Sequence, residues 1–107
     1  MPTTSDAALR RLYLKFNRQY WEGALPDNTR VLWVPVAGDR VAETCKMPDG
    51  TFEIKLSPSV SGFPRFYKWL LIHEMAHIPT WQTKADHGRL WKQEVLRVIQ
   101  AGAVRYL

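Results

Sequence analysis

Apolar residues recur at helical spacing over the first part of the chain. Between residues 5 and 22 they fall three or four positions apart, which places them along one face of an α-helix. This stripe consists of Leu9, Leu12, Tyr13, Phe16 and Tyr20. Ser5 or Asp6 can cap the start of the helix, because a side-chain oxygen there accepts a hydrogen bond from an unpaired backbone N–H. Gly23 and Pro26 end it.

The middle of the chain has the alternation of apolar and polar residues that is typical of β-strands. Strands are expected over 30–36, 41–46 and 51–56, and the third alternates most cleanly. Pro35 places the end of the first strand near a sheet edge or a bulge. A Pro-Asp-Gly turn at 48–50 joins the second strand to the third, since Pro presets φ and Gly accepts a positive φ.

Two further helices are expected in the last third of the chain. Pro64 suits the first turn of one, where its missing N–H is not needed, and Pro79 ends that helix. Its run of apolar residues at 69–72 indicates that it is buried on most sides. A last helix is expected over 87–101, capped by Asp86. The order α-β-β-β-α-α predicts a single α+β domain over 1–107, in which a small, mainly antiparallel three-stranded sheet packs against three helices.

The sequence H-E-M-A-H at 73–77 carries the candidate chemistry. Positions four apart on a helix lie on one face, so His73 and His77 can bind one zinc ion. Glu74 then sits beside the metal, where it can take a proton from a metal-bound water. A random chain shows this motif about once in a few hundred cases, so its context matters. Two histidines and a carboxylate on a buried helix are costly unless they are paired, and a metal supplies that pairing.

A zinc site of this type needs a third protein ligand, with water in the fourth position. His87 is the main candidate, mounted in the first turn of the last helix, where Gly88 lets the backbone approach closely. Glu94 is an alternative, because sites with two His and one Glu are well attested. Asp86 is a weaker one, since a capping role already accounts for it.

The motif at 73–77, followed by H-G-R-L-W at 87–91, resembles the SprT-like metallopeptidases, whose eukaryotic relatives are the Spartan-type proteases. The stretch F-N-R-Q-Y-W-E-G-A-L-P at 16–26 resembles the opening helix of that family and the Leu-Pro that follows it. The resemblance spans residues 9–100. It implies one zinc ion held by His73, His77 and His87, with Glu74 as the catalytic carboxylate. It also implies a zincin-like fold and cleavage of protein substrates, which for Spartan-type members are crosslinked or bound to DNA.

The expected function is therefore that of a zinc-dependent metalloendopeptidase. The zinc ion polarises a water molecule, Glu74 removes its proton, and the water attacks the peptide carbonyl. An extended substrate is expected along a sheet edge, for which the strand at 51–56 is the candidate. Tyr67, Arg89 and Tyr106 are candidate substrate or oxyanion contacts. The rival interpretations are a catalytically silent or latent zincin-fold binding module and a metal-free helical DNA-binding domain.

Charge and cysteine content add weaker expectations. Fifteen Lys and Arg against ten Asp and Glu give a net charge of +5, which favours polyanions. The candidate nucleic-acid contacts are Arg11, Lys15, Arg18, Lys84, Arg89 and Lys92, although a solvated surface explains the same residues. The lone Cys45 excludes an internal disulfide and a four-Cys zinc site within these residues, and is expected to behave as a small hydrophobe rather than as an inhibitory ligand. With no signal peptide and no membrane span, the expected location is the cytoplasm. The sequence does not determine the oligomeric state, for which a monomer is the default.

Overall fold

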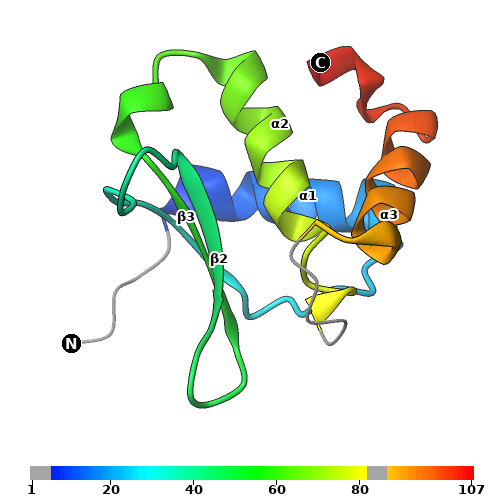
Figure 1. The fold of residues 1–107 in the computed structure, drawn as a ribbon, viewed down its shortest axis with the longest axis horizontal. Helices are drawn as coiled ribbons and strands as arrows, with labels where there is room; N and C mark the ends of the chain where they lie inside the picture. The colour runs from blue at the N-terminus through cyan, green and yellow to red at the C-terminus, as the bar shows by residue number, and fades with distance from the viewer. Residues whose placement is uncertain (1–5, 82–86) are drawn as a thin grey trace.

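Three helices and a three-stranded sheet follow one another in the predicted order in the computed structural model, which describes residues 6–81 and 87–107 (Figure 1). The α+β class is confirmed. The Cα radius of gyration is 13.0 Å, which matches the roughly 13 Å of a single compact domain of about 100 residues. The elements are α1 (Ala7–Trp21), β1 (Arg30–Trp33), β2 (Ala42–Lys46), β3 (Phe52–Leu56), the 3-10 turn η1 (Pro58–Val60), α2 (Pro64–Met75), α3 (Arg89–Gln100) and the 3-10 turn η3 (Ala103–Tyr106).

The sheet has the order β1-β3-β2, so β3 is its central strand. β3 pairs antiparallel with β2 through the predicted hairpin and parallel with β1. The sheet is therefore mixed rather than mainly antiparallel. Residues 34–41 connect β1 to β2 without pairing the two strands, and β3 then lies between them. The prediction that 51–56 is an edge strand is wrong. The alternation of apolar and polar residues suggested that one side of this strand faces solvent. Glu53 on that side is instead buried, in an ion pair with Arg30 of the neighbouring strand at 3.3 Å.

Helix α1 forms as its pattern predicts. The Asp6 carboxylate accepts a hydrogen bond from the Leu9 N–H at 3.0 Å, which caps the helix, and Glu22 closes it in a left-handed conformation. Tyr13 and Phe16 have no solvent exposure. Helix α1 passes behind α2, with the sheet on one side and α3 on the other, so its buried stripe faces the core (Figure 1).

Helix α2 is the central helix of the fold, and its α-helical part ends at Met75 rather than continuing to Pro79. Residues 76–80 form turns, in which the His77 N–H bonds to the Glu74 carbonyl three residues back, at 3.1 Å. Pro79 favours the early end, because a proline has no N–H to donate to the carbonyl four residues back, here that of Met75, and its ring clashes with that carbonyl. The two histidines of the motif therefore stand on either side of the helix end.

Helix α3 begins at Arg89, with Gly88 as its N-cap, and not at residue 87. His87 consequently lies in the turn before the helix. The predicted cap and alternative ligand Asp86 lies outside the described residues. Val95 and Val98 anchor α3 to the core. No helix in the described ranges is both long and apolar enough to cross a bilayer.

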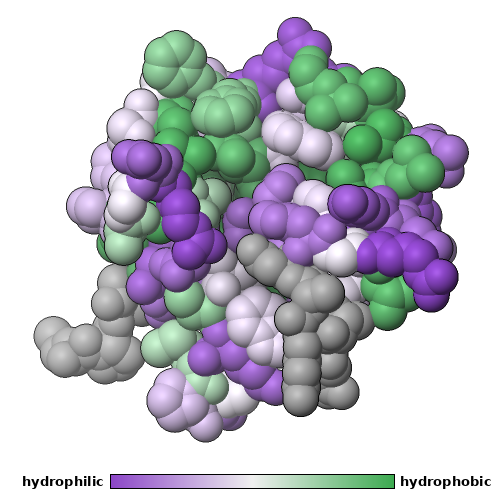
Figure 2. Space-filling model, in the orientation of Figure 1, coloured by the Kyte–Doolittle hydropathy of each residue, from purple (hydrophilic) through white to green (hydrophobic). Residues whose placement is uncertain are grey.

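Apolar surface is exposed at the start of α2 and near the C-terminal end of the chain, where Figure 2 shows hydrophobic side chains gathered. Phe63, Phe66, Val104 and Leu107 contribute to it. Because Phe63 and Phe66 belong to the beginning of α2, this surface is at the opposite end of the helix from His73.

Candidate metal centre

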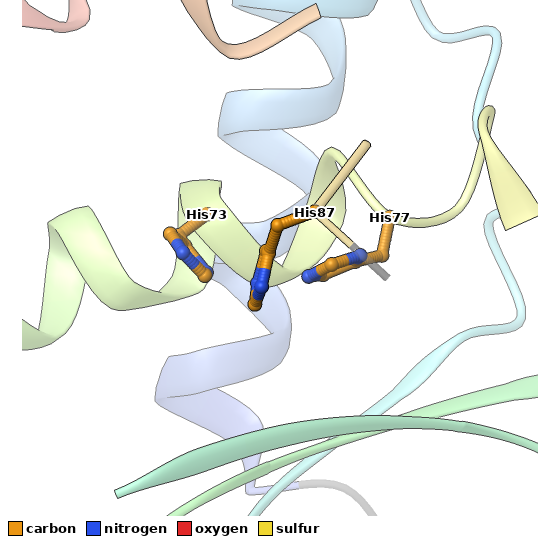
Figure 3. A group of neighbouring side chains, drawn as sticks. All are labelled: His73, His77 and His87. Atoms are coloured by element: carbon orange, nitrogen blue, oxygen red, sulfur yellow. The ribbon is translucent and has the colours of Figure 1, made fainter. Parts of the chain in front are cut away.

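The side chains of His73, His77 and His87 converge on one point (Figure 3). Their ring centroids are 5.7 Å apart for His73 and His77, 5.3 Å for His73 and His87, and 4.9 Å for His77 and His87. Zinc–nitrogen bonds of 2.0–2.1 Å in tetrahedral geometry put ring centres roughly 5.2 Å apart. One ligand nitrogen from each ring lies within 4.8 Å of the others, so small ring rotations would bring these nitrogens to the separation of roughly 3.3 Å that they have around a tetrahedral zinc ion. Three neutral nitrogen donors in this arrangement fit zinc.

The three rings come from two segments that only the fold brings together. His73 lies in the last turn of α2, His77 in the turn that follows, and His87 just before α3. His77 is buried, His73 is half-buried and His87 is exposed. The centre therefore opens to solvent on the side of His87.

Glu74 lies in the same cleft and is 6% exposed. Its Oε1 accepts a hydrogen bond from the Thr44 hydroxyl at 2.9 Å, and its Oε2 lies 3.0 Å from Nδ1 of His73. Burial raises the pKa of this carboxyl, but the hydrogen bonds from His73 and Thr44 and the nearby imidazoles outweigh burial, so the pKa is lowered overall. An ionised carboxylate only accepts hydrogen bonds, so Nδ1 of His73 is the donor and Nε2 is left for a metal.

The cleft around these residues has a volume of about 220 Å³ and lies between α2, the β2 side of the sheet and His87. Its lining consists of Arg40, Val41, Ala42, Thr44, Leu70, His73, Glu74, His77, Trp81 and His87. Arg40 and Thr44 are cleft residues that the sequence analysis missed. Strand alternation places positions 40, 42 and 44 on one face and could have grouped these residues. It does not predict which face of the strand packs against α2.

The three proposed oxyanion or substrate contacts do not line this cleft. Tyr67 packs against Trp33 with ring centroids 5.1 Å apart, and Tyr106 packs against Phe16 at 5.6 Å. Arg89 is exposed at the first position of α3. In the part of the chain described, none of these three borders the cleft.

Glu94, the alternative third ligand, is engaged elsewhere. Its Oε1 accepts hydrogen bonds from Nε1 of Trp21 at 2.7 Å and from Nη2 of Arg97 at 2.5 Å. The group of metal-binding side chains found among the described residues contains His87 and not Glu94.

The candidate nucleic-acid contacts that the structure describes lie outside the cleft. Arg11, Lys15 and Arg18 are exposed along one face of α1, and Lys92 is exposed on α3 together with Arg89. Lys84 lies outside the described residues.

Comparison with known proteins bears on almost the whole chain. The sequence model of the SprT-like family matches residues 9–105, a range that runs from α1 into η3 and includes Glu74 and the three histidines. Searches of curated proteins and of solved structures gave no significant match.

Proposed function

The chain belongs to the SprT-like family, and from this premise we propose that it is a zinc-dependent endopeptidase that cleaves protein substrates. The observation that carries the proposal is the position of Glu74, an ionised carboxylate in hydrogen-bond contact with one of three converging histidines. A general base must lie within reach of the water it activates. Glu74 lines the same cleft as the three histidines, which supports it as the base for a nucleophile bound at their centre.

The histidine cluster supports zinc as the metal. Three neutral imidazoles leave a fourth position open, which is the pattern of catalytic rather than structural zinc sites. Zinc bound there would lower the pKa of water and polarise the scissile carbonyl. Nε2 of His73 is directed to this role because its Nδ1 is held by Glu74.

The two carboxylate oxygens of Glu74 have different tasks in this proposal. Oε1 is held by the Thr44 hydroxyl, so it sets the orientation of the group. Oε2 faces the histidines, so it accepts the proton of the attacking water and then delivers that proton to the leaving amine. Burial keeps bulk water from competing for both oxygens.

The substrate is proposed to bind along β2, whose outer side is an edge of the sheet formed by the described residues. The Ser57 N–H bonds to the Val41 carbonyl at 2.8 Å. Hydrogen-bonded pairs alternate along an antiparallel ladder, so the backbone groups of Ala42, Thr44 and Lys46 point away from β3. A substrate strand added there gains main-chain hydrogen bonds with little demand on its sequence. This strand replaces β3 as the candidate edge, because β2 borders the cleft.

Glu74→Gln tests the proposal. The variant should bind one zinc ion per chain, as the wild type does, and should lose at least about 100-fold in casein cleavage, since it can no longer accept the proton. Glu22→Gln, an exposed substitution at the end of α1, is the matched control and should cleave normally. Equal cleavage by Glu74→Gln and wild type would refute the mechanism. A folded, zinc-loaded wild type that cleaves nothing would favour the silent binding module.

DNA contact is proposed as a separate property of the exposed cations on α1. Arg11, Lys15 and Arg18 form a line on the face opposite the buried stripe. Phosphate contacts release counterions, so retention on a DNA column should fall steeply as salt increases. Replacing these three residues by Glu should abolish retention, while retention that is the same at low and moderate salt would argue against contact.

A further inference from the structure

Trp91 contacts all three histidines of the candidate metal centre. Its ring centroid lies 4.5 Å from that of His87, 4.7 Å from that of His73 and 5.3 Å from that of His77. The indole stacks on His77, with 22° between the planes, and meets the other two rings edge to face. The side chain of Trp91 therefore packs against all three imidazoles.

The same indole links α3 to the end of α2. Its Nε1–H donates to the backbone carbonyl of His73 at 3.4 Å. This carbonyl is the group that a continuing α-helix would pair with the His77 N–H, which instead bonds to Glu74. The Trp91 hydrogen bond thus supports the backbone at the position where the helix ends between the two motif histidines.

We infer that Trp91 is a positioning residue for the metal centre, holding the three imidazoles in the arrangement that binds the ion. The inference rests on the proposed function only in taking zinc as that ion. His87 has the greatest need of such support, because it is exposed and lies outside any helix or strand. Rings held in place before binding lose less conformational entropy when the ion arrives, so preorganisation raises affinity.

The competing interpretation is that Trp91 is ordinary core material. It is half-buried and packs against the core cluster, as Trp33 also does. The two interpretations differ in what removal of the indole changes. Loss of packing lowers the stability of the metal-free protein, whereas loss of positioning lowers its affinity for zinc.

Trp33→Leu is a matched control for Trp91→Leu, since Trp33 contacts Tyr67 and does not line the cleft. The dissociation constant of zinc is measured on each metal-free protein by competition with a chelator, and the melting temperature is measured in parallel. Trp91→Leu should weaken zinc binding by about 10- to 100-fold, the range found for outer partners of metal ligands. Trp33→Leu should bind zinc as tightly as wild type even if its melting temperature falls. Zinc affinity unchanged in Trp91→Leu, or equally weakened in Trp33→Leu, would overturn the inference.

Trp91→Phe covers the case in which the leucine variant does not fold. This variant keeps an aromatic ring but loses the indole N–H and part of the ring surface that contacts the histidines. Zinc binding should therefore weaken measurably, but by less than in Trp91→Leu. Zinc should also change the tryptophan emission of the wild type, and most of that change should be lost in Trp91→Phe, because Trp91 is the tryptophan that contacts all three histidines in the described residues. Wild-type affinity together with an unaltered emission response would refute the positioning role.

These measurements separate the inference from the proposed function. A chain whose zinc affinity depends on Trp91 but which cleaves no protein would refute the peptidase proposal alone. A peptidase whose zinc affinity does not depend on Trp91 would refute the positioning role alone.

Discussion

The hydroxyl of Thr44 lies 2.9 Å from Oε1 of Glu74, joining the edge strand of the sheet to the carboxylate of the metal centre. The same hydroxyl is 3.2 Å from the Glu74 backbone carbonyl, so the strand holds both the side chain and the helix turn that bears it. Thirty residues of sequence separate the two partners. The strand that is proposed to bind the substrate also orients the proposed base.

Thr44→Val should lower kcat about tenfold and leave KM within about twofold. The change keeps the shape of the side chain and removes one hydrogen bond to a charged group, which contributes roughly 1.5–3 kcal/mol. Thr44→Ser keeps the hydroxyl and should restore most of the rate. Steady-state cleavage of a peptide substrate measures both constants, and zinc content should be the same in all three proteins. A wild-type kcat in Thr44→Val would show that Glu74 needs no such support.

Asn17→Ala should lower the free energy of unfolding by about 2–4 kcal/mol. Asn17 is 3% exposed. Its Nδ2 donates to the Leu25 carbonyl at 2.9 Å, and its Oδ1 accepts from the Leu25 N–H at 3.0 Å. Removing the amide leaves both backbone groups of a buried residue without these partners, which is costly. Urea denaturation measures the loss. Gln19→Ala, an exposed change on the same helix, should stay within about 0.5 kcal/mol of wild type.

Cys45 should react slowly with iodoacetamide at neutral pH. Burial and then the nearby Glu43 carboxylate raise the pKa of its thiol, and Lys55 offsets this only in part. A raised pKa lowers the thiolate fraction at pH 7, so the alkylation rate should lie below that of a free cysteine peptide and increase as the pH rises above about 8.5. Strand alternation places Cys45 on the face of the sheet opposite Thr44. Cys45→Ser should therefore keep full zinc content, and loss of zinc in that variant would contradict this placement.

Most elements were predictable from the sequence because their patterns are local. Helix α1 follows from its apolar stripe and from the cap at Asp6, and the β2–β3 hairpin follows from its turn at 48–50. The C-terminal end of α2 and the start of α3 were missed by a few residues. At those ends, turn geometry near Pro79 and Gly88 competes with helical propensity, and spacing does not resolve that competition.

The sequence by itself determined the candidate chemistry: His73, Glu74 and His77 are neighbours along one stretch of chain, and their spacing predicted that the two imidazoles lie on one side. In the structure a turn after the end of α2, rather than a continuous helix, carries His77 to that side. Only the tertiary structure decided which strand borders the cleft, whether His87 or Glu94 completes the cluster, and which residues support the site. Strand order depends on pairing between distant segments, and Thr44 and Trp91 act through contacts across 30 and 18 residues of sequence. Periodicity describes the face of a single element, whereas these contacts arise from how separate elements pack.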